Sequence, residues 1–176
     1  MVRSPGSRAT GFTFPRQVAG ERLCLADFVH PHVNGATPKA ADSVAFFITT
    51  AGEGVRGKAE DLKAAGEYLL CHALQALAVE TAEAAAEWLH AKLRAAWGFP
   101  DPPEISMTDR FQGRYRGKRY SFGYPACPEL SDQATLFRLL DGGKIGVALT
   151  EGFMMDPEAS VSAVVVHHPQ ARYFAA

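Results

Sequence analysis

The sequence lacks a long hydrophobic run, and this absence bears on where the protein works. The longest strongly apolar run, Val161 to Val166, is far too short to cross a bilayer. The basic N-terminus has no apolar segment behind it, so we expect no secretory signal. The 3 cysteines stand far apart and without C-x-x-C spacing. These absences predict a cytoplasmic protein with no disulfide framework and no membrane partner.

Excess positive charge is missing too, and so are the common catalytic motifs. The 176 residues carry a formal net charge of −1, so we expect no nucleic-acid partner. Histidines cluster at His30–His32 and His167–His168, but neither pair has a third ligand at zinc-like spacing, so no metal site is predicted. The sequence contains no G-x-S-x-G turn, no G-x-G-x-x-G loop and no P-loop. We therefore predict no catalytic residue.

What is present suits one globular domain. A hydrophobic content of 47% and a charged content of 21% are ordinary for such a domain, and the length allows one real core. Residues 1–13, rich in Ser, Gly, Arg and Thr, predict a flexible arm. Residues 14–176 are predicted to form the domain.

A long helix dominates the predicted secondary structure. No proline and only one glycine, Gly66, lie between Ala59 and Trp97, so a single very long helix is predicted near 59–97. Its opposite face carries Glu83 among apolar residues and is a candidate for a second covered face. The face predicted to be the core side has 3.6-residue spacing and consists of Leu70, Leu74, Leu77, Thr81, Ala84, Ala85 and Trp88.

Shorter elements surround this helix. Ser131 is a plausible N-cap for a helix through Leu140, which Gly142 and Gly143 would stop. Helices interposed between strands predict an α/β or α+β fold. The predicted strands are Val44–Thr50, Lys144–Thr150, Ser160–His167 and Arg172–Ala175.

The most informative segment is Arg119-Tyr-Ser-Phe-Gly-Tyr-Pro-Ala-Cys-Pro128. Its two prolines fix two φ angles, and Gly123 permits a positive φ or a close approach. Arg119 offers a planar fork of donors that fits a carboxylate. The segment predicts a stiff loop suited to a small acidic ligand, although a structural turn with a surface arginine is equally compatible with these residues.

This segment resembles the S-adenosylmethionine-binding signature in the activation domain of cobalamin-dependent methionine synthase. The resemblance implies a single domain with a bent, largely antiparallel sheet flanked by helices. It runs from about Leu23 onward and corresponds to the C-terminal half of the usual family domain. Further segments resemble the same domain in the family's order and at close to its spacing: Leu25–Val29, Ala82–His90, Ile145–Glu151, Pro157–Ser162 and His168–Phe174.

The resemblance also implies which residues contact S-adenosylmethionine. Arg119 is expected to bind the α-carboxylate, and Glu83 is expected to bind the α-ammonium group. The main chain at Ser121 is expected to contact the ligand, and Tyr173 is expected near the sulfonium, which aromatic faces favour. Without the resemblance, Glu83 is an ordinary helix surface residue and Tyr173 a packed aromatic.

Four more residues of the loop are candidates for ligand contact. An extended loop can hold adenine through its backbone groups, and Tyr124 offers a second aromatic face for the sulfonium. These candidates are Gly123, Tyr124, Pro125 and Ala126.

By resemblance, the module binds S-adenosylmethionine and presents its methyl group to cobalamin, restoring methylcobalamin from the inactive cob(II)alamin state. Displacement by reduced cobalt needs alignment and no protein base, which fits the missing acid–base set. The implied partners are a cobalamin-binding domain, because the chain has no D-x-H-x-x-G pattern, and a flavodoxin-like electron donor.

Together with the cobalamin-binding domain, the chain is implied to be part of a methyltransferase. The isolated chain is not expected to be catalytic. The alternative is a non-catalytic ligand-sensing or docking module of the same fold, for the cobalamin domain or for flavodoxin. The family's N-terminal half, which has no equivalent in this sequence, favours the alternative, whereas Arg119, Glu83 and Tyr173 favour the first interpretation.

Overall fold

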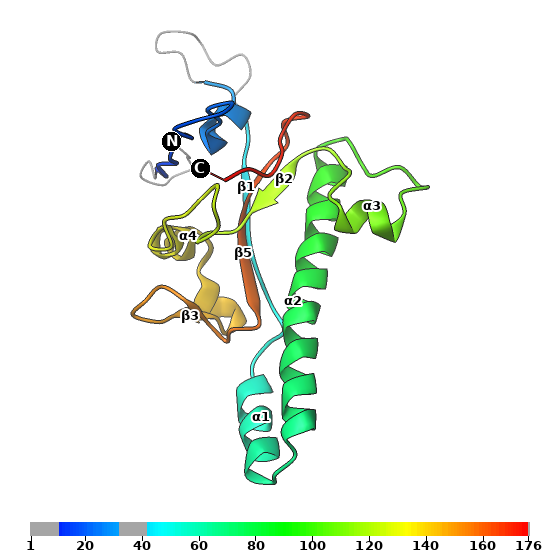
Figure 1. The fold of residues 1–176 in the computed structure, drawn as a ribbon, viewed down its shortest axis with the longest axis vertical. Helices are drawn as coiled ribbons and strands as arrows, with labels where there is room; N and C mark the ends of the chain where they lie inside the picture. Colours follow the sequence, from blue (N-terminus) through cyan, green and yellow to red (C-terminus); the bar gives the residue numbers. More distant parts are fainter. Residues whose placement is uncertain (1–10, 32–41, 176) are drawn as a thin grey trace. The chain divides into compact units, whose positions relative to one another are not determined.

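The computed structural model describes residues 11–31 and 42–175, in which helices and short strands are interspersed (Figure 1). These residues form two compact units. Unit 1 contains the described residues up to Phe46, then Ala91–Glu129 and the residues from Val164 onward. Unit 2 contains Phe47–His90 and Leu130–Ala163.

Unit 2 starts with most of strand β1 (Ala45–Thr50), then helix α1 (Val55–Ala64) and most of helix α2 (Tyr68–Ala96). Between the helices, Gly66 has a φ of 80°, and the amides of Gly66 and Glu67 donate to the carbonyls of Lys63 and Leu62. This is a Schellman C-cap, which ends α1 and reverses the chain. The predicted long helix is confirmed as α2, but residues 59–64 belong to α1.

The buried side of α2 differs from the predicted one. In the predicted stripe, Leu70 and Trp88 are 53% and 63% exposed. Small side chains let a neighbouring backbone approach closely, and the hydroxyl of Thr49 in β1 donates to the carbonyl of Ala82 at 3.2 Å. The prediction was wrong because it weighed side-chain size and ignored this close approach. The α2 residues that are buried within unit 2 are Cys71, Ala78, Ala82, Ala86 and His90.

The remainder of unit 2 follows the signature segment. Helix α4 (Asp132–Leu140) begins directly after Ser131, as predicted, but the Ser131 side chain makes no capping hydrogen bond to the helix. The predicted strand Lys144–Thr150 is shorter, because Gly142–Ile145 form the 3₁₀ helix η2 and only Ala148–Leu149 form strand β3. Strand β3 pairs antiparallel with β4 (Met155–Asp156).

A three-stranded sheet has the order β1-β5-β2, with β5 (Ser160–Val166) in the centre. Strand β2 (Lys118–Tyr120) runs antiparallel to β5 and places Arg119 opposite Val165. Gly117, just before β2, has a φ of 76°, and a Cβ there would lie 2.7 Å from the carbonyl oxygen of Val166. The predicted mixed fold of helices and antiparallel strands is confirmed.

The predicted strand Arg172–Ala175 is wrong, because these residues form no strand. Their carbonyls accept hydrogen bonds from side chains in place of a ladder. Tyr120 donates to the carbonyl of Arg172 at 2.8 Å, and the Gln17 amide donates to the carbonyl of Ala175. This segment is therefore held by side chains that are distant in the sequence.

A buried ion pair fixes the end of α2 within unit 1. Arg94 and Asp101 have side chains only 1% and 7% exposed, and they meet through two bonds of 2.6 Å. The Arg94 guanidinium carbon lies 3.7 Å from the centre of the Tyr115 ring, and Arg110 adds a contact of 3.4 Å to Asp101. Arg110 belongs to helix α3 (Met107–Phe111). This network joins α2, α3 and the chain that leads into β2.

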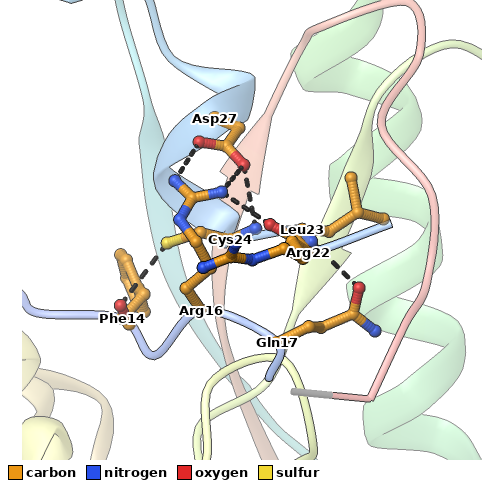
Figure 2. A network of polar contacts seen from close by, with 7 residues as sticks. All are labelled: Phe14, Arg16, Gln17, Arg22, Leu23, Cys24 and Asp27. Carbon is orange, nitrogen blue, oxygen red and sulfur yellow. Dashed lines mark hydrogen bonds and ion pairs between the residues drawn. The ribbon is translucent and has the colours of Figure 1, made fainter. Parts of the chain in front are cut away.

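The N-terminal part of unit 1 is folded around the 3₁₀ helix η1 (Leu25–Phe28). Arg16 binds both carboxylate oxygens of Asp27 at 2.6 Å (Figure 2). Residues 11–13 of the predicted arm are described, and the Phe12 ring centre lies 5.2 Å from that of Phe46. Residues 1–10 and His32 lie outside the described residues. Within the described part, no helix is long and apolar enough to cross a membrane.

We predict that Asp101→Asn lowers the free energy of unfolding by about 3 kcal/mol or more, because it leaves the Arg94 charge buried without its carboxylate. Urea denaturation measures this loss. Asp61→Asn, the same change at an exposed position of α1, is the control and should cost less than about 0.5 kcal/mol. Equal effects of the two substitutions would contradict the role of the ion pair.

We also predict that Gly117→Ala destabilises the protein by at least about 2 kcal/mol, through a left-handed φ and a clash with the Val166 carbonyl. The control is Gly57→Ala in α1, where nothing lies within 4 Å of the added Cβ. That control should stabilise by about 0.5–1 kcal/mol. Thermal melts of both variants test the pair, and a neutral Gly117→Ala would be inconsistent with this close approach.

Candidate functional site

The signature segment forms a tight loop after β2 that its own backbone closes. The amide of Cys127 donates to the carbonyl of Tyr124 at 2.8 Å, which makes a β-turn with Pro125 in its second position. The amide of Gly123 donates back to the carbonyl of Cys127 at 2.9 Å. Gly123 has a φ of 88°, which favours glycine. The stiffness predicted from the sequence is thus present in the backbone.

The loop has an anchored side and a presented side. Phe122, Ala126 and Cys127 are buried, whereas Tyr124 is 66% exposed. The Phe122 ring packs 5.6 Å from that of Phe12, which adds the N-terminal segment to the anchor. The loop therefore offers an aromatic ring and main-chain groups to solvent from a fixed base.

Arg119 is the middle residue of β2, and its neighbours fix the strand. Side chains alternate along a strand, so Lys118 and Tyr120, both buried, share the face opposite to Arg119, which is half-buried. The Lys118 ammonium donates to the carbonyls of Tyr115 and Gly117 at 2.8 and 2.9 Å. These contacts hold one face of β2, and the Arg119 side chain lies on the other face.

Tyr173 lies beside β2, in the segment held by side chains. Its ring centre is 5.7 Å from that of Tyr120, in an edge-to-face arrangement, and the side chain is 57% exposed. A Cβ on Gly113 would lie 3.6 Å from Cε2 of Tyr173, so the ring covers this glycine. Burial, together with the neighbouring Tyr173, raises the pKa of Tyr120 far above its usual value, so its hydroxyl stays a donor.

The structure brings most of the predicted site residues into unit 1. Arg119, Ser121 and the loop residues 123–126 follow one another along β2 and its loop. Tyr173 packs on Tyr120, on the face of β2 opposite to Arg119. Glu83 is an exposed residue of α2 in unit 2. Its part in the site stays a prediction from the family resemblance.

Sequence reasoning missed Tyr120 and the N-terminal segment as neighbours of Tyr173. Glu21 forms an ion pair with Arg172, and Gln17 bonds to the carbonyl of Ala175. The sequence signal for Tyr120 is its position directly after Arg119, where alternation points it to the other face of the strand. No local pattern indicates the contacts of Gln17 and Glu21, because they lie more than one hundred residues away along the chain.

A pocket of about 510 Å³ opens in unit 1. It is lined by Phe99–Pro102, Gly113–Arg116 and Pro169, and none of the predicted ligand residues lines it. No group of three or more His, Cys, Asp or Glu that could hold a metal ion occurs among residues 11–31 and 42–175.

Similar proteins agree with the resemblance carried by the signature. The family model described as "Vitamin B12 dependent methionine synthase, activation domain" matches residues 11–176. Methionine synthases from Mycobacterium tuberculosis (strain ATCC 25618 / H37Rv) and Mycobacterium leprae (strain TN) are 37% and 35% identical over 170 residues. Each match covers 93% of this chain and 14% of the relative.

A solved structure is similar as well. The crystal structure of the MetH reactivation domain bound to AdoHcy matches with a TM-score of 0.82 and 34% sequence identity. The match covers 92% of this chain and 50% of that chain, so this chain spans about half of the solved relative. With a family model that matches nearly all of its length, the chain belongs to the family of vitamin B12-dependent methionine synthase activation domains.

Proposed function

We propose that this chain binds S-adenosylmethionine and presents its methyl group to cobalamin, which reactivates methionine synthase. The observation that carries the proposal is the signature loop, which closes on itself after a strand that displays Arg119. The AdoHcy bound by the solved relative supports it, because AdoHcy is what remains when S-adenosylmethionine gives up its methyl group.

In this proposal Arg119 binds the α-carboxylate of the ligand. A guanidinium forms two parallel hydrogen bonds with a carboxylate, which fixes the orientation of the ligand as well as its charge. The main chain around Ser121 and the residues Gly123–Ala126 hold the adenosyl part, because their backbone is already ordered before the ligand arrives.

Tyr173 and Glu83 complete the proposed ligand set. The exposed ring of Tyr173 offers its π face to the sulfonium, an interaction of the cation–π kind. Glu83 offers a carboxylate for the α-ammonium group. Both assignments come from the family resemblance.

The proposed reaction requires only alignment from this chain. The methyl carbon leaves the sulfonium, whose sulfur keeps the electron pair and becomes a thioether, and it forms a bond to reduced cobalt. The cobalamin is a substrate held by another domain, and a flavodoxin-like protein supplies the electron. Orientation alone accounts for large rate gains in such a transfer, so no protein base is needed.

The proposed setting is the cytoplasm, where thiols stay reduced. All 3 thiols of the chain, those of Cys24, Cys71 and Cys127, are buried, and none forms a disulfide. This arrangement fits a reducing compartment.

We predict that Arg119→Ala weakens S-adenosylmethionine binding at least tenfold, about 1.4 kcal/mol, because the α-carboxylate loses its cation. Isothermal titration calorimetry measures the affinity for S-adenosylmethionine and for AdoHcy. Arg138→Ala, at an exposed position of α4, is the matched control and should leave both affinities unchanged. No binding by the folded wild-type chain would sink the proposal.

A coupled assay separates reactivation from docking. Wild-type protein is mixed with a cobalamin-binding domain, a reducing flavodoxin and methyl-labelled S-adenosylmethionine, and methylcobalamin is followed by its absorbance. We expect methylcobalamin to form with the wild-type protein and to form more slowly with Arg119→Ala. Ligand binding without any methylcobalamin would favour a ligand-sensing or docking module.

We predict that Glu83→Gln weakens S-adenosylmethionine binding by about tenfold, since the substitution removes the negative charge that pairs with the ammonium group. A des-amino analogue of the ligand provides the check. Because it has no ammonium group, Glu83→Gln should leave its affinity unchanged. Glu60→Gln, at an exposed position of α1, is the control. If Glu83→Gln weakens both ligands equally, the assignment to the ammonium group is wrong.

A further inference from the structure

Tyr173 stands in a segment that has no strand pairing to hold it. Residues 172–175 form no strand, and the ring of Tyr173 is more than half exposed. A side chain that must meet a ligand from such a segment loses conformational freedom on binding unless other contacts order it beforehand. The contacts that order this segment therefore bear on the ligand affinity.

Tyr120 in β2 supplies the first set of contacts to residues 172–174. Its hydroxyl donates to the carbonyl of Arg172 at 2.8 Å, and its ring packs edge-on against Tyr173 and Phe174 at 5.7 and 6.3 Å. The side chain is only 4% exposed, so the ring has little freedom of its own. Burial raises its pKa above the usual tyrosine value, so the hydroxyl remains a donor under alkaline as well as neutral conditions.

The N-terminal segment supplies a second set of contacts, to Arg172 and Ala175. Glu21 pairs with the Arg172 guanidinium, and the Gln17 amide donates to the carbonyl of Ala175. Gln17 is itself fixed, because its side-chain oxygen accepts from the amide of Leu23 at 2.9 Å (Figure 2).

Arg16 stabilises the N-terminal segment that contains Gln17 and Glu21. It binds the carboxylate of Asp27 and the carbonyl of Arg22, each at 2.6 Å. The tethers on residues 172 and 175 thus flank Tyr173 on both sides along the chain.

We propose that Tyr120 is a positioning residue for S-adenosylmethionine. Its hydroxyl holds the carbonyl of Arg172, and with Gln17 at Ala175 it keeps the Tyr173 ring in place for the ligand. The inference rests on the proposed function, since the family resemblance assigns Tyr173 to the ligand.

The test is a double-mutant cycle on ligand affinity combined with a ligand-free measurement. Tyr120→Phe removes one hydroxyl and keeps the ring, so the fold should survive. We expect S-adenosylmethionine binding to weaken about three- to tenfold, because the segment must then be ordered at the moment of binding. In a Tyr173→Ala background, the same change should cost little more. Tyr68→Phe, an exposed tyrosine of α2, is the control and should leave the affinity unchanged.

Hydrogen exchange without ligand reports on the tether directly. The amides of residues 172–175 should exchange faster in Tyr120→Phe than in the wild type and in the Tyr68→Phe control. Gln17→Ala should act in the same direction from the other end of the segment, and it provides a second variant if Tyr120→Phe folds poorly.

The outcomes separate the two proposals. Faster exchange together with a non-additive loss of affinity supports the positioning role. Unchanged exchange, or a Tyr120→Phe loss that is fully additive with Tyr173→Ala, overturns it while the proposed function stands. A wild-type chain that does not bind S-adenosylmethionine overturns the proposed function, and the positioning role with it.

Discussion

The buried ion pair between Arg94 and Asp101 is the interaction on which the position of β2 and the signature loop depends. Two charges that leave water are expensive unless their partners are complete, and here a bidentate contact, the Tyr115 ring and Arg110 surround them. Such a network has little tolerance for displacement, because each charge would lose solvation without a replacement. It therefore fixes the last turn of α2 against the chain that leads into β2, where Arg119 lies.

Backbone contacts also fix the chain between this ion pair and the signature loop. Gly117 lets the chain approach β5 where a Cβ would clash, and β2 then pairs with β5 for three residues. The loop that follows closes with two hydrogen bonds of its own, between Gly123 and Cys127 and between Cys127 and Tyr124. A loop ordered in this way loses little entropy when a ligand binds, which suits the proposed alignment of a methyl group.

The sequence was informative where structure is decided by neighbours along the chain. The signature loop, the helix that follows Ser131 and the central strand all depend on short-range turn chemistry and periodicity, and they were predicted. The predicted helix ran through Gly66, whereas in the structure Gly66 is left-handed and ends α1 in a C-cap, which helix propensity does not reveal. The buried side of α2 was missed because its small residues, such as Ala82, let β1 lie close enough for the Thr49 hydroxyl to reach the Ala82 carbonyl, which depends on the fold.

In the segment around Tyr173, contacts that are distant in the sequence decide the structure. Its apolar and aromatic residues predicted a strand, yet its carbonyls bond to Tyr120 and Gln17, which no local pattern connects to it. A segment that is tied by side chains opens more easily than one in a ladder, and ligand-binding segments are commonly drawn from such less stable parts. The signature loop is ordered by its own backbone and could be predicted from the sequence, whereas the Tyr173 segment is held by distant side chains that no local pattern reveals.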